Sequence, residues 1–284
     1  ISALENQNQL YTAAANDTVD YTNGTVTYSL KSGTGDVASL NIGSSSGVVT
    51  LKSGNLDYET KSSYSFTVIA ADATGNTREQ AVTITVTNLD EVAPSITSDS
   101  TASAIAENSG AGQVIYTVTS TDTTDYVSGS TTYSLSGTDA SLFTINSSTG
   151  AVTLTANPNY ETKSSYSFNV VATDAAGNTS SKAVTLAITN VDEIAPAFTS
   201  ATTGTALENQ NQLYTAAAND TVDYTNGTVT YSLKSGTGDV ASLSIDSSSG
   251  LVTLKSGNLD YETKSSYSFT VIAADATGNT REQA

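Results

Sequence analysis

Apolar and polar residues alternate along much of this chain, and the alternation predicts strands with one buried face. In residues 166–174 the apolar side chains stand at every second position, namely Tyr166, Phe168, Val170 and Ala172. Residues 184–188 repeat the pattern with Val184, Leu186 and Ile188. There is no helical period longer than a single turn, so the pattern predicts an all-β fold.

Glycine, asparagine and serine residues at expected turns divide residues 95–189 into seven short strands. We predict a first strand in two halves and six strands after it: Ser95–Ser98 with Ala102–Ala106, then Gln113–Ser120, Thr131–Leu135, Leu142–Asn146, Ala151–Thr155, Tyr166–Asp174 and Lys182–Thr189. Seven short strands of this kind are typical of an antiparallel Greek-key sandwich of the immunoglobulin-like type. The tyrosine and phenylalanine stripe is expected to form the core of that sandwich.

The chain carries this unit three times. Residues 3–81 and 206–284 differ at only three positions, Asn41/Ser244, Gly43/Asp246 and Val48/Leu251, and a diverged copy lies between them. A period of about a hundred residues is the size of one domain. We therefore expect tandem sandwiches joined end to end, with repeats at residues 1–94, 95–196 and 197–284. The first repeat is expected to lack its first strand and the third its last strand, as in a segment of a longer array.

Composition narrows the chemistry that the chain can perform. The 284 residues carry a formal net charge of −18 and include no cysteine, histidine, methionine or tryptophan. A disulfide, a thiolate zinc site, a cysteine nucleophile and a histidine base are therefore excluded. Only ten basic residues are present, which disfavours binding to nucleic-acid phosphates. No apolar run is long enough to predict a transmembrane helix.

Two short acidic linkers separate the repeats. Asn88–Pro94 reads Asn-Leu-Asp-Glu-Val-Ala-Pro, and Asn190–Pro196 reads Asn-Val-Asp-Glu-Ile-Ala-Pro. Each follows a predicted strand and ends in proline, which has no N–H to extend a sheet. Two carboxylates in so short a stretch repel one another, whereas Ca²⁺ is bound by carboxylate, amide and carbonyl oxygens. The linkers therefore predict a cation site, and the alternative is an acidic hinge without a ligand.

Further acids recur at the same offset in every repeat. There is an early Glu-Asn, an Asp-x-x-Asp before the third strand, a Tyr-Glu after the fifth strand, and an aspartate at the end of the sixth. Their acidic members are Glu5, Glu107 and Glu208; Asp17 with Asp20, Asp122 with Asp125, and Asp220 with Asp223; Glu59, Glu161 and Glu262; and Asp72, Asp174 and Asp275. A merely solvated face would scatter its acids, so this recurrence favours a shared binding role.

These motifs and their spacing resemble the cadherin repeat, in particular the bacterial cadherin-like domains of large surface adhesins. The resemblance covers the whole chain and implies Ca²⁺ bound between successive domains. For the first junction it implies the ligands Glu5, Asp57, Glu59, Asn88, Asp90 and Glu91, with Asp122, Asp125 and Asp174 from the following repeat. For the second junction it implies Glu107, Asn159, Glu161, Asn190, Asp192 and Glu193, with Asp220, Asp223, Asn226 and Asp275.

The chain departs from the cadherin pattern in its linkers and its lack of tryptophan. Where cadherins have Asp-x-Asn-Asp-Asn, the linkers here read Asn-x-Asp-Glu followed by Val or Ile. Adhesion by exchange of a tryptophan-bearing strand does not carry over, because tryptophan is absent. The two junctions also differ at Asp57 and Asn159. Since ligand charge raises affinity for Ca²⁺, this difference predicts weaker binding at the second junction.

The function these observations predict is a Ca²⁺-rigidified spacer in a secreted or cell-surface adhesin or filament. Its expected partners are calcium ions, the neighbouring repeats, other copies of the chain and surface glycans. The alternative is a carbohydrate-binding or self-associating module, for which Tyr11, Tyr21 and Tyr126 are the candidate contacts. An enzyme is not expected, since every carboxylate pair recurs in each repeat and a catalytic site rarely does.

Overall fold

The computed structural model describes residues 1–17, 24–123, 125, 129–221, 223 and 227–284. Asp20, Tyr21, Tyr126 and Asn226 lie outside the described residues. Contacts between Cα atoms group the chain into two compact units. The first comprises Ile1–Ser103, Gly112–Thr155 and Ser167–Leu186, and the second Ala104–Ala111, Ala156–Tyr166 and Ala187–Ala284. The linker Asn88–Pro94 therefore belongs to the first unit, and the linker Asn190–Pro196 belongs to the second.

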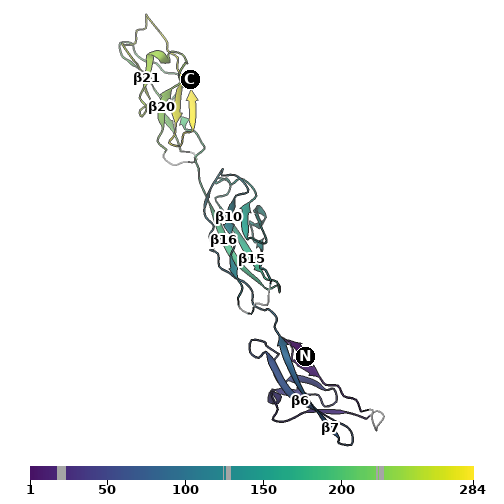
Figure 1. The fold of residues 1–284 in the computed structure, drawn as a ribbon. Coiled ribbons are helices and arrows are strands. Elements are labelled where there is room, and N and C mark those ends of the chain that lie inside the picture. The colour runs from purple at the N-terminus through teal and green to yellow at the C-terminus, as the bar shows by residue number, and fades with distance from the viewer. Residues whose placement is uncertain (18–23, 124, 126–128, 222, 224–226) are drawn as a thin grey trace. The chain divides into compact units, whose positions relative to one another are not determined.

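The first repeat is a sandwich of two sheets. Its strands are β1 (Ser2–Leu4), β2 (Gln9–Thr12), β3 (Thr27–Leu30), β4 (Leu40–Ile42), β5 (Val48–Leu51), β6 (Ser63–Ala71) and β7 (Thr77–Thr87). One sheet has the order β1-β7-β6-β3 and the other β2-β5-β4. Figure 1 shows the long hairpin of β6 and β7, which carries the antiparallel pairing from Ser63↔Thr85 to Ala71↔Thr77. Among the described strands of the first repeat, β1 alone runs parallel to its neighbour, β7.

The second repeat follows the same plan. Its strands are β8 (Ser95–Ile96), β9 (Ile105–Ala106), β10 (Val114–Thr117), β11 (Ser120–Thr121), β12 (Thr132–Ser136), β13 (Phe143–Ile145), β14 (Ala151–Leu154), β15 (Ser165–Thr173) and β16 (Thr179–Thr189). The sheet orders are β12-β15-β16-β9, β10-β14-β13 and β11-β8. Every strand predicted from alternation is present, and the predicted Gln113–Ser120 is divided into β10 and β11, which belong to different sheets.

The third repeat contains β17 (Ala197–Phe198), β18 (Gln212–Thr215), β19 (Ala218–Asn219), β20 (Thr230–Leu233), β21 (Leu243–Ile245), β22 (Leu251–Leu254), β23 (Val271–Ala274) and β24 (Thr280–Gln283). Its sheets have the orders β20-β23-β24, β18-β22-β21 and β17-β19. Each repeat also has one short 3₁₀ turn, at Val37–Ser39, Ala140–Leu142 and Val240–Ser242. Among the described residues, no helix has the length and apolar character needed to cross a membrane.

Two expectations about the ends are wrong in part. The first repeat does have the second half of its first strand, because β1 pairs parallel with β7 as β9 does with β16. Short as it is, β1 is held by the ladder from Ser2↔Thr85 to Leu4↔Thr87. The third repeat has the start of its last strand, since β24 pairs antiparallel with β23. The split first strand explains the first error, because its two halves join different sheets.

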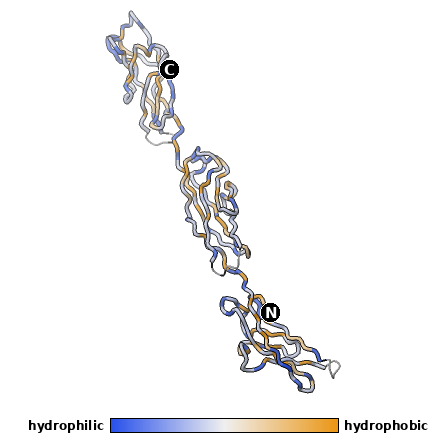
Figure 2. The backbone as a smooth tube through the Cα atoms, in the orientation of Figure 1, coloured by the Kyte–Doolittle hydropathy of each residue, from blue (hydrophilic) through white to orange (hydrophobic). Residues whose placement is uncertain are grey.

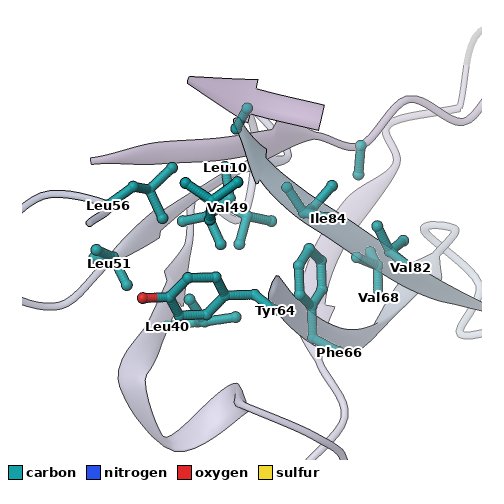
Figure 3. Close-up of a cluster of buried hydrophobic side chains, with 13 residues drawn as sticks. Leu10, Leu40, Val49, Leu51, Leu56, Tyr64, Phe66, Val68, Val82 and Ile84 are labelled. Atoms are coloured by element: carbon teal, nitrogen blue, oxygen red, sulfur yellow. The ribbon is translucent and has the colours of Figure 1, made fainter. Parts of the chain in front are cut away.

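Alternating apolar residues fill the space between the sheets. Figure 2 shows apolar positions in orange spaced along the strands between paler and blue ones. Figure 3 shows this core in the first repeat, where side chains from both sheets point toward one another: Leu10, Leu40, Val49, Leu51, Leu56, Tyr64, Phe66, Val68, Val82 and Ile84. In the second repeat Phe168 takes the central place, with its ring 4.5 Å from that of Phe143 and 6.4 Å from that of Tyr116.

Truncation of Phe168 tests this packing. Its side chain is 1% exposed, so Phe168→Ala leaves a cavity and should lower the unfolding free energy of the second repeat by about 3–5 kcal/mol. Hydrogen exchange of β15 and β16 measures that change in the full chain. Val114→Ala, at a position that is 60% exposed, is the control and should change stability by less than about 0.5 kcal/mol. Equal effects of the two substitutions would contradict the core assignment.

Candidate metal centres at the two linkers

A buried glutamate ties three segments together at the first linker. Glu5 follows β1 and is 4% exposed. Its Oε2 accepts the backbone N–H of Tyr58 at 2.8 Å, and its Oε1 accepts the N–H of Leu89 in the linker. The carboxylate is thereby fixed where the Tyr-Glu loop meets the linker. Carboxylate oxygens of Glu5, Glu59 and Glu91 all lie within 4.8 Å of one another, and we call this set the first Glu group.

Glu91 is positioned by contacts to both repeats. The side-chain amide of Asn6 donates to Glu91 Oε1, and the backbone N–H of Glu91 donates to Asp125 Oδ2 at 2.9 Å. Asn6 and Asp125 both have positive φ, at 64° and 61°. Asparagine and aspartate adopt this left-handed conformation more readily than other residues with a side chain. Glu91 is thus hydrogen-bonded to Asn6 of the first repeat and to Asp125 of the second.

A second set of acids, the first Asp group, consists of Asp90, Asp122 and Asp174, whose oxygens also lie within 4.8 Å of one another. Asp174 directly follows β15, and its Oδ1 accepts the N–H groups of Gly177 and Asn178 at 2.7 and 2.8 Å. The Asn178 amide donates to the backbone oxygen of Asp90 at 2.7 Å. The turn after β15 is therefore bonded directly to the linker.

The second linker repeats both arrangements. The second Glu group is Glu107, Glu161 and Glu193, and the second Asp group is Asp192, Asp220 and Asp275. Glu107 is 2% exposed and accepts the N–H groups of Tyr160 at 2.7 Å and Val191 at 2.8 Å. Asn108 donates to Glu193, and Asn279 donates to the backbone oxygen of Asp192 at 2.9 Å. The two linkers thus use the same backbone anchors for their carboxylates.

Buried oxygen atoms without a hydrogen-bond partner gather at these groups. Among the described residues they are Asn88 Oδ1, both carboxylate oxygens of Asp122, Asp125 Oδ1, Asp174 Oδ2, Asp220 Oδ2 and Asp275 Oδ2, with Ser180 Oγ lying elsewhere. A buried carboxylate oxygen without a partner is costly, and a bound cation removes that cost. The donors are all oxygens, which suits a hard ion such as Ca²⁺ rather than zinc or copper. The residues present therefore fit calcium.

In each Asp group, burial and the neighbouring carboxylates change the pKa values of the members. Burial, followed by the charges of Asp90 and Asp174, raises the pKa of Asp122. Burial, followed by the charges of Asp192 and Asp275, raises the pKa of Asp220 in the same way. For Asp174 burial acts in the same direction, but hydrogen bonds from Asn178 and Gly177 outweigh it and lower the pKa. Each group therefore holds a carboxylate stabilised by N–H donors beside one that lacks them.

Not every residue expected at the junctions belongs to these groups. Asp57 Oδ1 accepts the N–H of Thr60 at 2.8 Å, and Asn159 Oδ1 accepts that of Thr162 at 2.7 Å. Asp260 forms the same turn with Thr263 in the third repeat. Each of these side chains therefore serves a local turn, and the prediction that Asn159 weakens the second junction stays a prediction. Asn190 donates to the backbone oxygen of Asp223 at 2.8 Å and so lies beside the second Glu group.

Two pairs of asparagines were missed by the sequence analysis. Asn6 and Asn108 hold the Glu groups, and Asn178 and Asn279 hold the linker backbone. The Glu-Asn dipeptide was noted as recurrent, but no role was assigned to its asparagine; the Gly-Asn dipeptide recurs in the same way, and only the direction of each side chain reveals its partner. In the first repeat the equivalent Asn76 donates to Asp72 Oδ2 at 2.7 Å instead. With Thr74, this bond lowers the pKa of Asp72 to about 2.

Comparisons with known proteins agree with the geometry. The family profile described as Cadherin domain matches residues 1–87, 101–191 and 203–284. Mouse protocadherin Fat 4 is 30% identical over 208 residues, which are 69% of this chain and 4% of that protein. Rat cadherin-23 is 30% identical over 269 residues, which are 88% of this chain and 8% of that protein. The chain thus spans less than a tenth of the length of these curated relatives.

A solved structure shares the fold over nearly the whole chain. The crystal structure of mouse cadherin-23 EC22-24 has a TM-score of 0.59 and 25% identity, and the match covers 99% of this chain and 91% of that one. These relatives come from mouse and rat, so they give no support to the bacterial origin that the sequence resemblance implied. The all-β fold of tandem sandwiches is confirmed.

Asp122 offers a test of the charge repulsion. Its raised pKa means that the ionised carboxyl destabilises the metal-free fold above that pKa, and that this cost vanishes below the ordinary value of 3.8. Asp122→Asn should therefore raise the melting temperature of the chelator-treated chain at neutral pH, with the difference from wild type disappearing in acid. Asp99→Asn, which removes an exposed acid outside both groups, is the control. A melting temperature lowered by Asp122→Asn in chelator would contradict this account.

Proposed function

Because this chain belongs to the cadherin family, we propose that it is a Ca²⁺-rigidified segment of an extracellular adhesion protein. The observation that carries the proposal is the set of buried, unpartnered carboxylate oxygens at both linkers, of which Asp122 contributes two. In the absence of a cation these carboxylates repel one another. The function of the segment is then to hold successive repeats in a fixed relation when Ca²⁺ is present.

The residues proposed to hold Ca²⁺ are the four groups with their neighbouring oxygens. The Glu groups and the Asp groups supply twelve carboxylates: Glu5, Glu59, Glu91, Asp90, Asp122, Asp174, Glu107, Glu161, Glu193, Asp192, Asp220 and Asp275. Asn88 and Asp125 add buried oxygens at the first linker. Bound Ca²⁺ supplies positive charge to these carboxylates. The chain itself orients them through Glu5 and Glu107, which join the linker backbone to their own repeat.

The carbohydrate-binding alternative has less support. Of its candidate contacts, Tyr21 and Tyr126 lie outside the described residues. Tyr11 is half-buried and packs against the core of the first repeat, with its ring 6.1 Å from that of Phe66. An aromatic side chain used in this way stabilises the sandwich and offers little surface for stacking on a sugar. Other copies of the chain stay proposed partners, together with the neighbouring repeats.

Chelation tests the proposed function in the full chain. Extracellular calcium modules bind at roughly 10⁻⁴ to 10⁻³ M, and free Ca²⁺ at ten to a hundred times Kd stabilises by about 1.4 to 2.7 kcal/mol per site. Removing Ca²⁺ should therefore lower the melting temperature, and X-ray scattering should report a shorter maximum dimension as the linkers loosen.

Matched variants make the test specific. Asp122→Asn should weaken Ca²⁺ binding by at least about tenfold in calorimetric titration, since even outer-shell partners of a metal are worth 10–100-fold. Asp99→Asn should leave the titration unchanged, because Asp99 lies outside the groups. Scattering and melting that do not respond to chelator would overturn the rigid-spacer function.

A further inference from the structure

The two Asp groups differ by one side chain in the turn that follows the sixth strand of each repeat. The turn reads Asp174-Ala175-Ala176-Gly177-Asn178 in the second repeat and Asp275-Ala276-Thr277-Gly278-Asn279 in the third. Ala176 therefore stands where the other turn has Thr277. Both turns bond their asparagine amide to the linker backbone, so the hydroxyl of Thr277 is the added polar group.

The Thr277 hydroxyl lies between carboxylates of the linker and of the third repeat. Its Oγ1 is 2.8 Å from Asp275 Oδ1 and 3.3 Å from Asp192 Oδ2. The amide of Asn279 donates to the same Oγ1 at 3.0 Å, which leaves the hydroxyl proton to the two carboxylates. At the first linker Ala176 can make no such bridge. There Asp90 Oδ1 accepts the backbone N–H of Val92 at 3.3 Å and the Asn178 amide at 3.4 Å, and no hydroxyl joins Asp90 to Asp174 among the described residues.

The second Asp group is also the more buried. Asp192, Asp220 and Asp275 are 8%, 4% and 6% exposed, whereas in the first group only Asp174, at 7%, is as buried, and Asp90 and Asp122 are half-buried. Both groups contain buried carboxylate oxygens without a hydrogen-bond partner, two in the second group and three in the first. Gly227 closes over Asp220, since a Cβ at that position would stand 2.2 Å from Asp220 Oδ2. The second group is therefore gathered and shielded by the protein to a greater degree than the first.

We propose that Thr277 is a positioning residue that makes the second Asp group the tighter Ca²⁺ site, so that the second linker fills before the first as Ca²⁺ rises. The inference rests on the proposed function and adds an order to it. A site whose ligands are already held together loses less conformational entropy on binding than one that must assemble them. Thr277 acts through Asp192 and Asp275 and need not touch the ion itself.

This order is the reverse of the one predicted from Asn159. That prediction rests on the lost charge at Asn159, and Asn159 and Asp57 make the same bond to the backbone N–H three residues on. The bridge by Thr277, in contrast, joins two members of the group. The second Asp group therefore has two of its carboxylates held together by a hydrogen bond before an ion binds, and the first Asp group lacks the equivalent hydroxyl.

The first repeat shows that the threonine is placed by its own turn. Thr74 Oγ1 donates to Asp72 Oδ1 at 2.8 Å, the same distance as between Thr277 and Asp275. The threonine rotamer is thus set before a linker is engaged, and the contact to Asp192 follows from it. Thr74 also supplies a matched control, because it has the same local bonds and belongs to neither Asp group.

The test is a Ca²⁺ titration of the full chain followed by hydrogen exchange of the two linker peptides, which differ in sequence and are resolved by mass. In the wild type the second linker should become protected at lower free Ca²⁺ than the first. Thr277→Ala and the near-isosteric Thr277→Val should raise the second midpoint about tenfold and leave the first unchanged. Ala176→Thr, at an exposed position, should lower the first midpoint, and Thr74→Ala should move neither.

The outcomes separate this inference from the function on which it rests. Two linkers that both respond to Ca²⁺ at the same midpoint, or a second midpoint unmoved by Thr277→Val, would overturn the role of Thr277 and leave the rigid spacer standing. Linkers that show no response to Ca²⁺ would overturn both. Exchange in β22, which Leu251 distinguishes by mass from the equivalent strand of the first repeat, verifies in the same experiment that each variant is folded.

Discussion

The repulsion between carboxylates that the fold brings together at each linker is the main physical constraint on this structure. The ion pairs of the first repeat, Lys31 with Glu79 and Lys61 with Asp36, use acids away from these groups, and the third repeat does the same. The groups thus concentrate negative charge that the chain does not neutralise through those pairs. In the proposed function, folding of the linker region is coupled to Ca²⁺, because the cation removes the repulsion between the gathered carboxylates.

The strands of each sandwich fix the positions of the acids that lie at its ends. The long hairpins β6–β7 and β15–β16 deliver Asp72 and Asp174 at one end of a repeat, while Glu5 and Glu107 sit at the end of short strands held parallel to β7 and β16. A core packed around Phe168 or Phe66 keeps these ends in place. The mechanical property of the array therefore depends on ordinary packing in each repeat as well as on the acids.

Near-identical repeats reveal which contacts are local and which need a neighbour. Asp57 and Asp260 make the same bonds to the threonine three residues on. The side-chain amide of Asn76 donates to Asp72 Oδ2, whereas that of Asn279, in the same sequence context, donates to the backbone oxygen of Asp192 in the linker. The first of these contacts is therefore local, and the second joins the turn to the linker. The same comparison explains why Asp72 has a pKa of about 2 in the first repeat.

The sequence by itself determined the class of fold, the three repeats and most of the acids that are proposed to bind the cation. Alternation of apolar residues is a local property of a strand, so Ser165–Thr173 could be predicted from its own residues almost to the end points. Tertiary structure alone decided which acids meet. Glu5, Glu59 and Glu91 come from three segments, and their grouping depends on loop geometry and on the backbone N–H groups that fix Glu5. The sequence pattern could not reveal the bridge from Thr277 to Asp192, because the two residues lie far apart in the chain and only the folded structure brings them together.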